Sequence, residues 1–165
     1  MADLLFITPQ EMTNTTIIGG NVDVDKYTMC ILSTQLRVIE PLLGTLLYNK
    51  IIADIEGNTL AGLYLKLFDD FLKPITKYES CANYIAISPY SLTNGGLFKN
   101  NPENAVAVGV KEVDNLSEKY SSMAQMFVDR FNKWISLNPL SEYKEKQDEV
   151  DVQKININNS WEFYD

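Results

Sequence analysis

The feature that most constrains the fold is an apolar pattern between Lys26 and Ile55 that is interrupted once. Its first part repeats apolar residues at alternating steps of three and four, which is the spacing of one stripe of an α-helix. Pro41 and Gly44 then break the pattern, and a shorter second set resumes it. The two sets are Met29, Leu32, Leu36, Ile39 and Leu43, followed by Leu46, Leu47, Ile51, Ile52 and Ile55. The sequence therefore predicts two helices joined by a bend, each with an apolar face that must be buried.

Two further segments show the same helical spacing. The first begins near Thr59, has a kink at Pro74 and continues to Ile85, and the second begins after Gly109 and ends at Asn138. The apolar stripe of the first is Leu60, Leu63, Leu67, Phe71 and Ile75, and that of the second is Val113, Leu116, Tyr120, Met123, Phe127, Phe131 and Trp134. We therefore predict an all-α fold, a small helical bundle.

A stretch of different character, residues 89–110, separates these last two helices. Asn94-Gly95-Gly96 and Asn100-Asn101-Pro102 are turn signals, and the apolar pair Leu97 and Phe98 lies between them. A connection of this length inside a helical domain usually has a function. We predict a long loop or hairpin that contacts a neighbouring molecule through Leu97 and Phe98.

The two ends of the chain lack a continuous helical pattern. Residues 1–24 are predicted to form an N-terminal arm with one short helical turn, capped by Thr8 and Glu11 in a capping box. Residues 139–165 alternate apolar and polar residues at strand spacing, which is typical of a disordered tail or of an extended arm that docks on a partner. The aromatic end favours the docking arm. Its candidate contact residues are Val150, Val152, Ile155, Ile157, Trp161 and Phe163. The predicted organisation is an arm (1–24), a helical domain (25–138, with the loop 89–110) and a docking tail (139–165).

The charge and hydropathy of the chain argue against several partners. The formal net charge is −8, and residues 141–165 carry half of it, so duplex DNA is not expected as a directly bound ligand. No apolar run approaches the roughly 18 residues of a membrane span. We expect no membrane partner and a protein that is assembled in the cytoplasm.

The residue types that most enzyme centres require are absent or isolated. The chain has no histidine, and its cysteines, Cys30 and Cys81, fit no redox or metal spacing, so buried free thiols are favoured over a disulfide. No glycine-rich phosphate-binding motif occurs. Paired carboxylates are interpreted as helix caps or solvated faces; they are Asp23/Asp25, Asp69/Asp70 and Glu149/Asp151. We predict no catalytic, cofactor-binding or metal-binding residue, and no enzymatic activity.

Several short motifs resemble a known family. They are Ile39-Glu40-Pro41-Leu42-Leu43-Gly44 with Leu47-Tyr48, and Thr93-Asn94-Gly95-Gly96-Leu97. Over about residues 6–137 the chain is similar to the head–tail connector, or adaptor, proteins of tailed bacteriophages, and most similar to those of Bacteroidales phages, including the crAss-like group.

The resemblance implies a structural virion protein that forms a closed ring, expected to be dodecameric, between the portal and the tail. Such a ring would extend the DNA channel, through which DNA passes without specific binding, and would give further neck and tail proteins a docking surface. The C-terminal segment would reach onto the portal protein. Pro41 and Gly44 would set the angle between two helices that pack in the ring.

Two alternative functions of other classes remain open on the sequence alone. One is a small metal-dependent hydrolase or nuclease that uses carboxylates, which calorimetry with Mg²⁺ or Mn²⁺ would test. The other is an acidic inhibitor or DNA mimic that acts on a host enzyme. Capture of a host DNA-binding protein would support this second alternative over a place in the virion.

Overall fold

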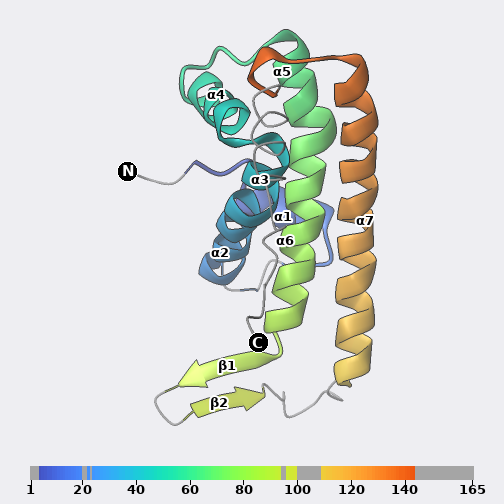
Figure 1. The fold of residues 1–165 in the computed structure, drawn as a ribbon. Helices are drawn as coiled ribbons and strands as arrows, with labels where there is room; N and C mark the ends of the chain where they lie inside the picture. The colour runs from blue at the N-terminus through green and yellow to red at the C-terminus, as the bar shows by residue number, and fades with distance from the viewer. Residues whose placement is uncertain (1–3, 20–21, 23, 94–95, 100–108, 144–165) are drawn as a thin grey trace, which may run out of the picture.

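The computed structural model describes residues 4–19, 22, 24–93, 96–99 and 109–143, and its architecture confirms the predicted all-α fold. Two long helical segments dominate and lie side by side (Figure 1). The first is formed by α5 (Gly62–Leu67), the π-helix η2 (Phe68–Leu72) and α6 (Lys73–Ile87) in direct succession, and the second is α7 (Val110–Leu137). A third segment, α2 (Val24–Thr34), packs against α6, so α6 lies between α2 and α7.

The elements that follow α2 lead toward one end of this arrangement, and the two strands lie at the other end (Figure 1). The π-helix η1 (Gln35–Ile39), α3 (Glu40–Leu43) and α4 (Thr45–Glu56) follow α2 toward the end where α5 begins. The strands β1 (Tyr90–Thr93) and β2 (Gly96–Lys99) form an antiparallel hairpin at the opposite end, with Leu92 paired to Leu97 and Ser91 to Phe98. The hairpin falls within the predicted loop or hairpin of residues 89–110.

The described residues bury two apolar clusters. The first joins α3, α4, η2 and the C-terminal half of α7, and the second joins α2, the C-terminal half of α6 and the N-terminal segment. Burying each of these large side chains contributes about 1.5–3 kcal/mol. Fully buried members of the first cluster include Ile39, Leu43, Leu47, Ile51, Leu72, Ile75 and Phe131, and the second contains Ile7, Met12, Ile18, Tyr27, Ile31, Cys81 and Ile85.

The N-terminal segment is part of this core, which corrects its assignment to an arm outside the helical domain. The predicted short helix is present as α1 (Pro9–Thr15), with the Thr8–Glu11 capping box at its start. Phe6 packs in the first cluster and the next residue, Ile7, in the second. The side-chain amide of Gln35 accepts a hydrogen bond from the Phe6 backbone N–H (2.8 Å) and donates one to the Leu4 carbonyl (2.9 Å). Sequence reasoning missed this anchor.

Each of the π-helices in the described chain is followed by a proline. Pro41 comes two residues after η1, and Pro74 two residues after η2. A proline inside an α-helix has no N–H to donate, and its ring clashes with the carbonyl four residues earlier. In the wider π-turn the N–H of Glu40 bonds instead to the Gln35 carbonyl five residues back. Both segments therefore stay helical through a proline, and the helix predicted to continue past Pro74 does so.

Candidate functional site

The predicted bend lies at Gly44 rather than at the proline. Gly44 ends α3 and precedes α4, with φ 78° and ψ 154°, a region of backbone conformation that essentially only glycine occupies. Its N–H donates to the Glu40 carbonyl (2.9 Å), and its own carbonyl accepts from Tyr48 (3.0 Å). Thr45 is the first residue of α4, so the cap position before it is Gly44, which has no side chain to form a capping hydrogen bond. Pro41 is exposed on α3.

The predicted apolar stripe of α2 and η1 is buried at Ile39 and Leu43 but exposed at Met29 and Leu36. Met29 and Leu36 are 59% and 57% exposed, whereas Tyr27 and Ile31 are buried against α6. This helix is apolar on more than one side, so periodicity alone cannot choose its inner face. A turn of the π-helix η1 contains nearly one residue more than a turn of an α-helix. Residues four apart in the sequence therefore remain on the same face where the chain passes through η1. The buried line is Tyr27, Ile31, Gln35, Ile39 and Leu43.

The inner face of α7 is predicted more accurately, and its outer face carries unburied apolar residues. Phe131 is buried, and Val113, Tyr120 and Trp134 pack against the two clusters, but Met123 is 47% exposed and Ala124 is buried near its level instead. The other exposed apolar residues of α7 are Val110, Met126 and Leu137.

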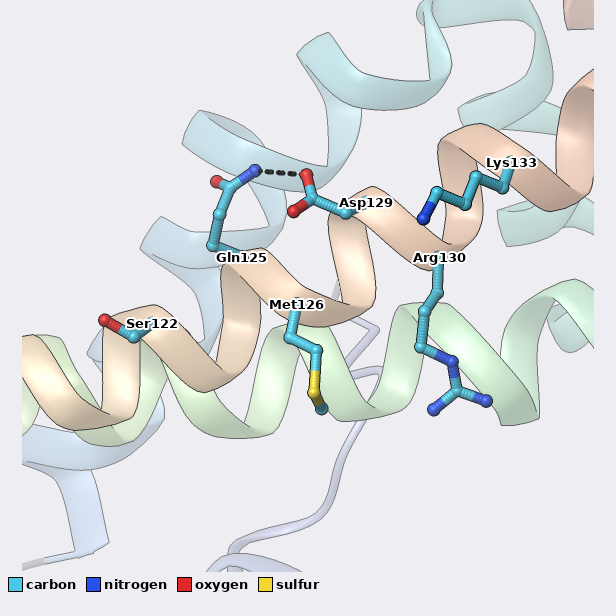
Figure 2. Close-up of a pocket in the computed structure, with 6 residues that line it drawn as sticks. All are labelled: Ser122, Gln125, Met126, Asp129, Arg130 and Lys133. Atoms are coloured by element: carbon cyan, nitrogen blue, oxygen red, sulfur yellow. Dashed lines mark hydrogen bonds between the residues drawn. The ribbon is translucent and has the colours of Figure 1, made fainter.

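A shallow hollow lies on the outer face of α7. Figure 2 shows Met126 and Arg130 extending in one direction from the helix, and Gln125 and Asp129 extending to the other side. The Gln125 amide donates to the Asp129 carboxylate (2.9 Å), and the Arg130 guanidinium lies 5.1 Å from the centroid of the Phe127 ring. The hollow is lined by Ser122, Gln125, Met126, Asp129, Arg130 and Lys133. Since all six belong to one helix, it is a surface feature rather than an enclosed pocket.

A polar network fixes the chain after α7 against α4 and α5. The Lys50 ammonium contacts both oxygens of Asp54 and lies 5.1 Å from the centroid of the Tyr64 ring. The Tyr64 hydroxyl donates to the Glu142 carboxylate (2.8 Å). Hydrogen bonding to Lys50 lowers the pKa of Asp54. Burial by itself would raise the pKa of Glu142, but hydrogen bonds from its own backbone and from Tyr64 outweigh it and lower that pKa.

The remaining predicted contact residues are placed only in part. Leu97 and Phe98 lie on β2, where they pair with Leu92 and Ser91 of β1. Val150, Val152, Ile155, Ile157, Trp161 and Phe163 lie outside the described residues. Pro41 and Gly44 both lie at α3, Pro41 within it and Gly44 directly after it. The hairpin that carries Leu97 and Phe98 lies at the other end of the molecule (Figure 1).

The other chemically interesting side chains are inert or solvated. Cys30 and Cys81 are buried free thiols, as predicted, and burial raises the pKa of each to about 11. Asp69 of η2 pairs with Lys73 at the start of α6 (3.3 Å), and its side chain is about half exposed. Within the described ranges, no three His, Cys, Asp or Glu side chains are grouped to hold a metal ion. None of the described helices is both long and apolar enough to cross a bilayer.

Sequence reasoning missed the cations on the outer face of α7, although the signal is present. Lys119, Arg130 and Lys133 continue the spacing of Met123 and Met126 along one line of the helix. Because this line mixes cations with apolar residues, apolar periodicity alone does not reveal it.

The comparisons with known proteins give one family match. The sequence model of a family of unknown function (DUF6712) matches residues 39–150, which run from the end of η1 beyond the end of α7. No curated protein and no solved structure matches the chain.

Proposed function

The chain belongs to the DUF6712 family, and from that premise we propose that it is a structural subunit of the neck of a tailed bacteriophage. Copies of the chain form a closed ring between the portal and the tail. The ring extends the DNA channel and provides the surface on which further neck or tail proteins dock. This proposal rests on the motif resemblance together with the surfaces described above.

The observation that carries the proposal is the position of the exposed apolar residues. One group of them lies on α2 and η1 and another on the outer face of α7, and these helices flank α6 (Figure 1); further exposed apolar residues lie on other elements. Scattered apolar residues on a surface are ordinary, but aligned ones mark interaction sites. Different contact faces on separate sides of a subunit produce a head-to-tail contact, which gives a ring when the rotation closes. The aligned exposed members are Met29 and Leu36 along α2 and η1, and Met123, Met126 and Leu137 on α7.

The two ends of the α6–α7 pair differ, which suits a subunit with a different neighbour above and below. One end carries the hairpin of β1 and β2, and the other carries α5 and residues 138–143 (Figure 1). In a neck ring, one of these ends would face the portal and the other the tail.

The charge of the chain is compatible with a DNA channel. At a formal net charge of −8 the subunit repels phosphates overall, so DNA can pass without being held. A clamp that bound DNA tightly would need clustered lysines and arginines facing the channel.

Cryo-electron microscopy of purified virions tests the proposal. We expect a ring below the portal in which each subunit shows the antiparallel pair of α6 and α7. Mass spectrometry of the same particles should detect the chain at a copy number similar to that of the portal. Virions whose neck is complete without this chain would refute the proposal.

A further inference from the structure

The outer face of α7 carries a regular line of exposed residues, which we call the α7 stripe. It consists of Lys119, Met123, Met126, Arg130, Lys133 and Leu137. The steps are four and three in alternation, so the six side chains lie along one side of the helix. Three are cations and three are large and apolar, although the chain as a whole is acidic.

Within its own subunit, the α7 stripe has exposed apolar side chains and lysines without an ion pair among the described residues. Met123, Met126 and Leu137 are 47%, 49% and 82% exposed. Among the described residues, no ion pair or hydrogen bond involves the side chain of Lys119 or Lys133. The one acid that lines the hollow, Asp129, is hydrogen-bonded to Gln125. An occupant of this face would therefore be acidic and apolar, and the two methionines suit an irregular apolar partner.

The C-terminal segment of the chain has this chemistry. Residues 148–165 contain five acids against one lysine. They also contain seven large apolar or aromatic residues: Val150, Val152, Ile155, Ile157, Trp161, Phe163 and Tyr164. The 22 residues after Tyr143 can span at most about 75 Å, and α7 is about 42 Å long, so the segment can cover the whole stripe.

The direction in which the described chain ends points to a different subunit. After α7 the chain crosses toward α5 (Figure 1). There Leu140 is buried, Glu142 is bonded to Tyr64, and Tyr143 packs edge-to-face on Phe131 at 5.8 Å. Phe131 belongs to the inner face of α7, so the last described residue, Tyr143, lies against the inner face of α7 and not on the stripe.

We propose that the α7 stripe binds residues 148–165 of a second copy of this chain. The contact rests on the proposed ring, in which copies are neighbours, and it names the surface and the segment that join them. The resemblance implies that this C-terminal segment binds the portal protein. The charge and the spacing of the residues in the α7 stripe indicate instead that it binds the neighbouring subunit.

Site-specific photocrosslinking in the full chain tests this contact. Trp161 is replaced by p-benzoylphenylalanine, and equal amounts of ¹⁴N-labelled and ¹⁵N-labelled copies are mixed before irradiation. We expect crosslinks from position 161 to α7 peptides that contain Met123–Leu137, with mixed isotopes in the crosslinked pair. Crosslinks within one copy alone, or to another surface, or none at all, would overturn the proposal.

Charge-reversal variants provide a second test of the same contact. Arg130→Glu with Lys133→Glu should lower the mixed-isotope crosslink about tenfold, because several surface charge interactions change sign together. Adding Asp148→Lys and Glu149→Lys should restore it. The matched control, Lys66→Glu with Lys111→Glu, makes the same charge change outside the stripe and should leave the crosslink unchanged. Thermal melts followed by circular dichroism verify that each variant folds.

The contact and the proposed function can fail separately. If the chain is present in the neck ring but gives no mixed-isotope crosslink, only the proposed contact is refuted. If the chain gives the crosslink but is missing from the virion neck, only the proposed function is refuted.

Discussion

Gln35 is the residue on which the N-terminal segment depends. It is 2% exposed, and its amide bonds to the backbone of both Leu4 and Phe6. Gln35→Leu would leave the Phe6 N–H and the Leu4 carbonyl unpaired beside the core. Because buried unpaired polar groups cost about 1–3 kcal/mol, we expect a loss of that size in the free energy of unfolding by urea. Amide hydrogen exchange at Phe6 should accelerate in parallel.

The control for this variant is Gln10→Leu. Gln10 is exposed, and its side-chain amide bonds to the neighbouring side chain of Asn14, so its replacement should change stability by less than about 0.5 kcal/mol. Equal losses for the two variants would show that the amide of Gln35 does not anchor the segment.

Glu11 makes the start of α1 sensitive to acid. The Thr8 backbone N–H donates to its carboxylate (2.8 Å), and this bond lowers the pKa of Glu11 below the ordinary 4.5. A lowered folded pKa means that the stabilisation is complete above the unfolded pKa and is lost as the pH falls through the folded one. At pH 7, Glu11→Gln should therefore cost about 0.3–1 kcal/mol, a small value because the carboxylate is largely solvated.

The measurement is urea unfolding of the wild type and of Glu11→Gln at pH values from 7 downward. The gap between them should close below pH 4.5, where the wild-type carboxylate becomes protonated. A gap of constant size over that range would contradict the assigned role of the charge.

Gly44 decides the connection between α3 and α4. At φ 78° and ψ 154° a side chain is strained whatever surrounds it, so Gly44→Ala should cost about 1–3 kcal/mol of stability. A bulkier residue such as valine would cost more. The resemblance implies that this bend sets the angle between two helices that pack in the ring, and the backbone geometry adds the prediction that a side chain at Gly44 destabilises the fold itself.

Chemical denaturation of Gly44→Ala beside Gly19→Ala measures this cost. A methyl group added at Gly19 would meet no atom within 4 Å, and the φ of Gly19 is not positive, so its alanine variant should match the wild type. Gly44→Ala with wild-type stability would mean that the connection readily adopts another conformation.

The helices could be predicted from the sequence, but the faces that they bury could be predicted only in part. The inner face of α7 was correct because its stripe is the single strongly apolar one, interrupted only at Met123. The inner face of α2 was wrong because Met29 and Leu36 offered a second stripe of equal regularity. The choice depends on packing against α6 and on the additional residue within η1, and neither is visible in a window of one helix.

The other features that the sequence pattern did not predict involve polar residues. Gln35 reads as one polar residue among apolar neighbours, yet it is buried because the backbone of Leu4 and Phe6 needs partners there. Lys119, Arg130 and Lys133 read as ordinary solvated charges, and their alignment with Met123 and Met126 becomes informative only once the outer face of α7 is known.

At the scale of the whole molecule, the exposed face of α2 and η1 should matter for association and not for folding. Met29→Glu with Leu36→Glu places charges where both side chains are more than half exposed, so stability should change by less than about 0.5 kcal/mol per site. A charged face opposes burial in a contact between copies, so ring formation should fall. Electron microscopy counts the rings, and denaturation checks the fold.

Leu63→Glu serves as the comparison, since Leu63 is an exposed leucine on α5, away from α2. Rings at wild-type abundance in the double variant would exclude the outer face of α2 from the contact.

The N-terminal segment also has a consequence for the timing of synthesis. Phe6 packs in the same cluster as Phe131 and Leu140, so a residue made at the start of translation finds its partners only near the end. At typical elongation rates this interval is on the order of 10 s. During that time Phe6 has left the ribosome without the α7 side chains that later enclose it, so the first cluster can close only after Phe131 and Leu140 have been made.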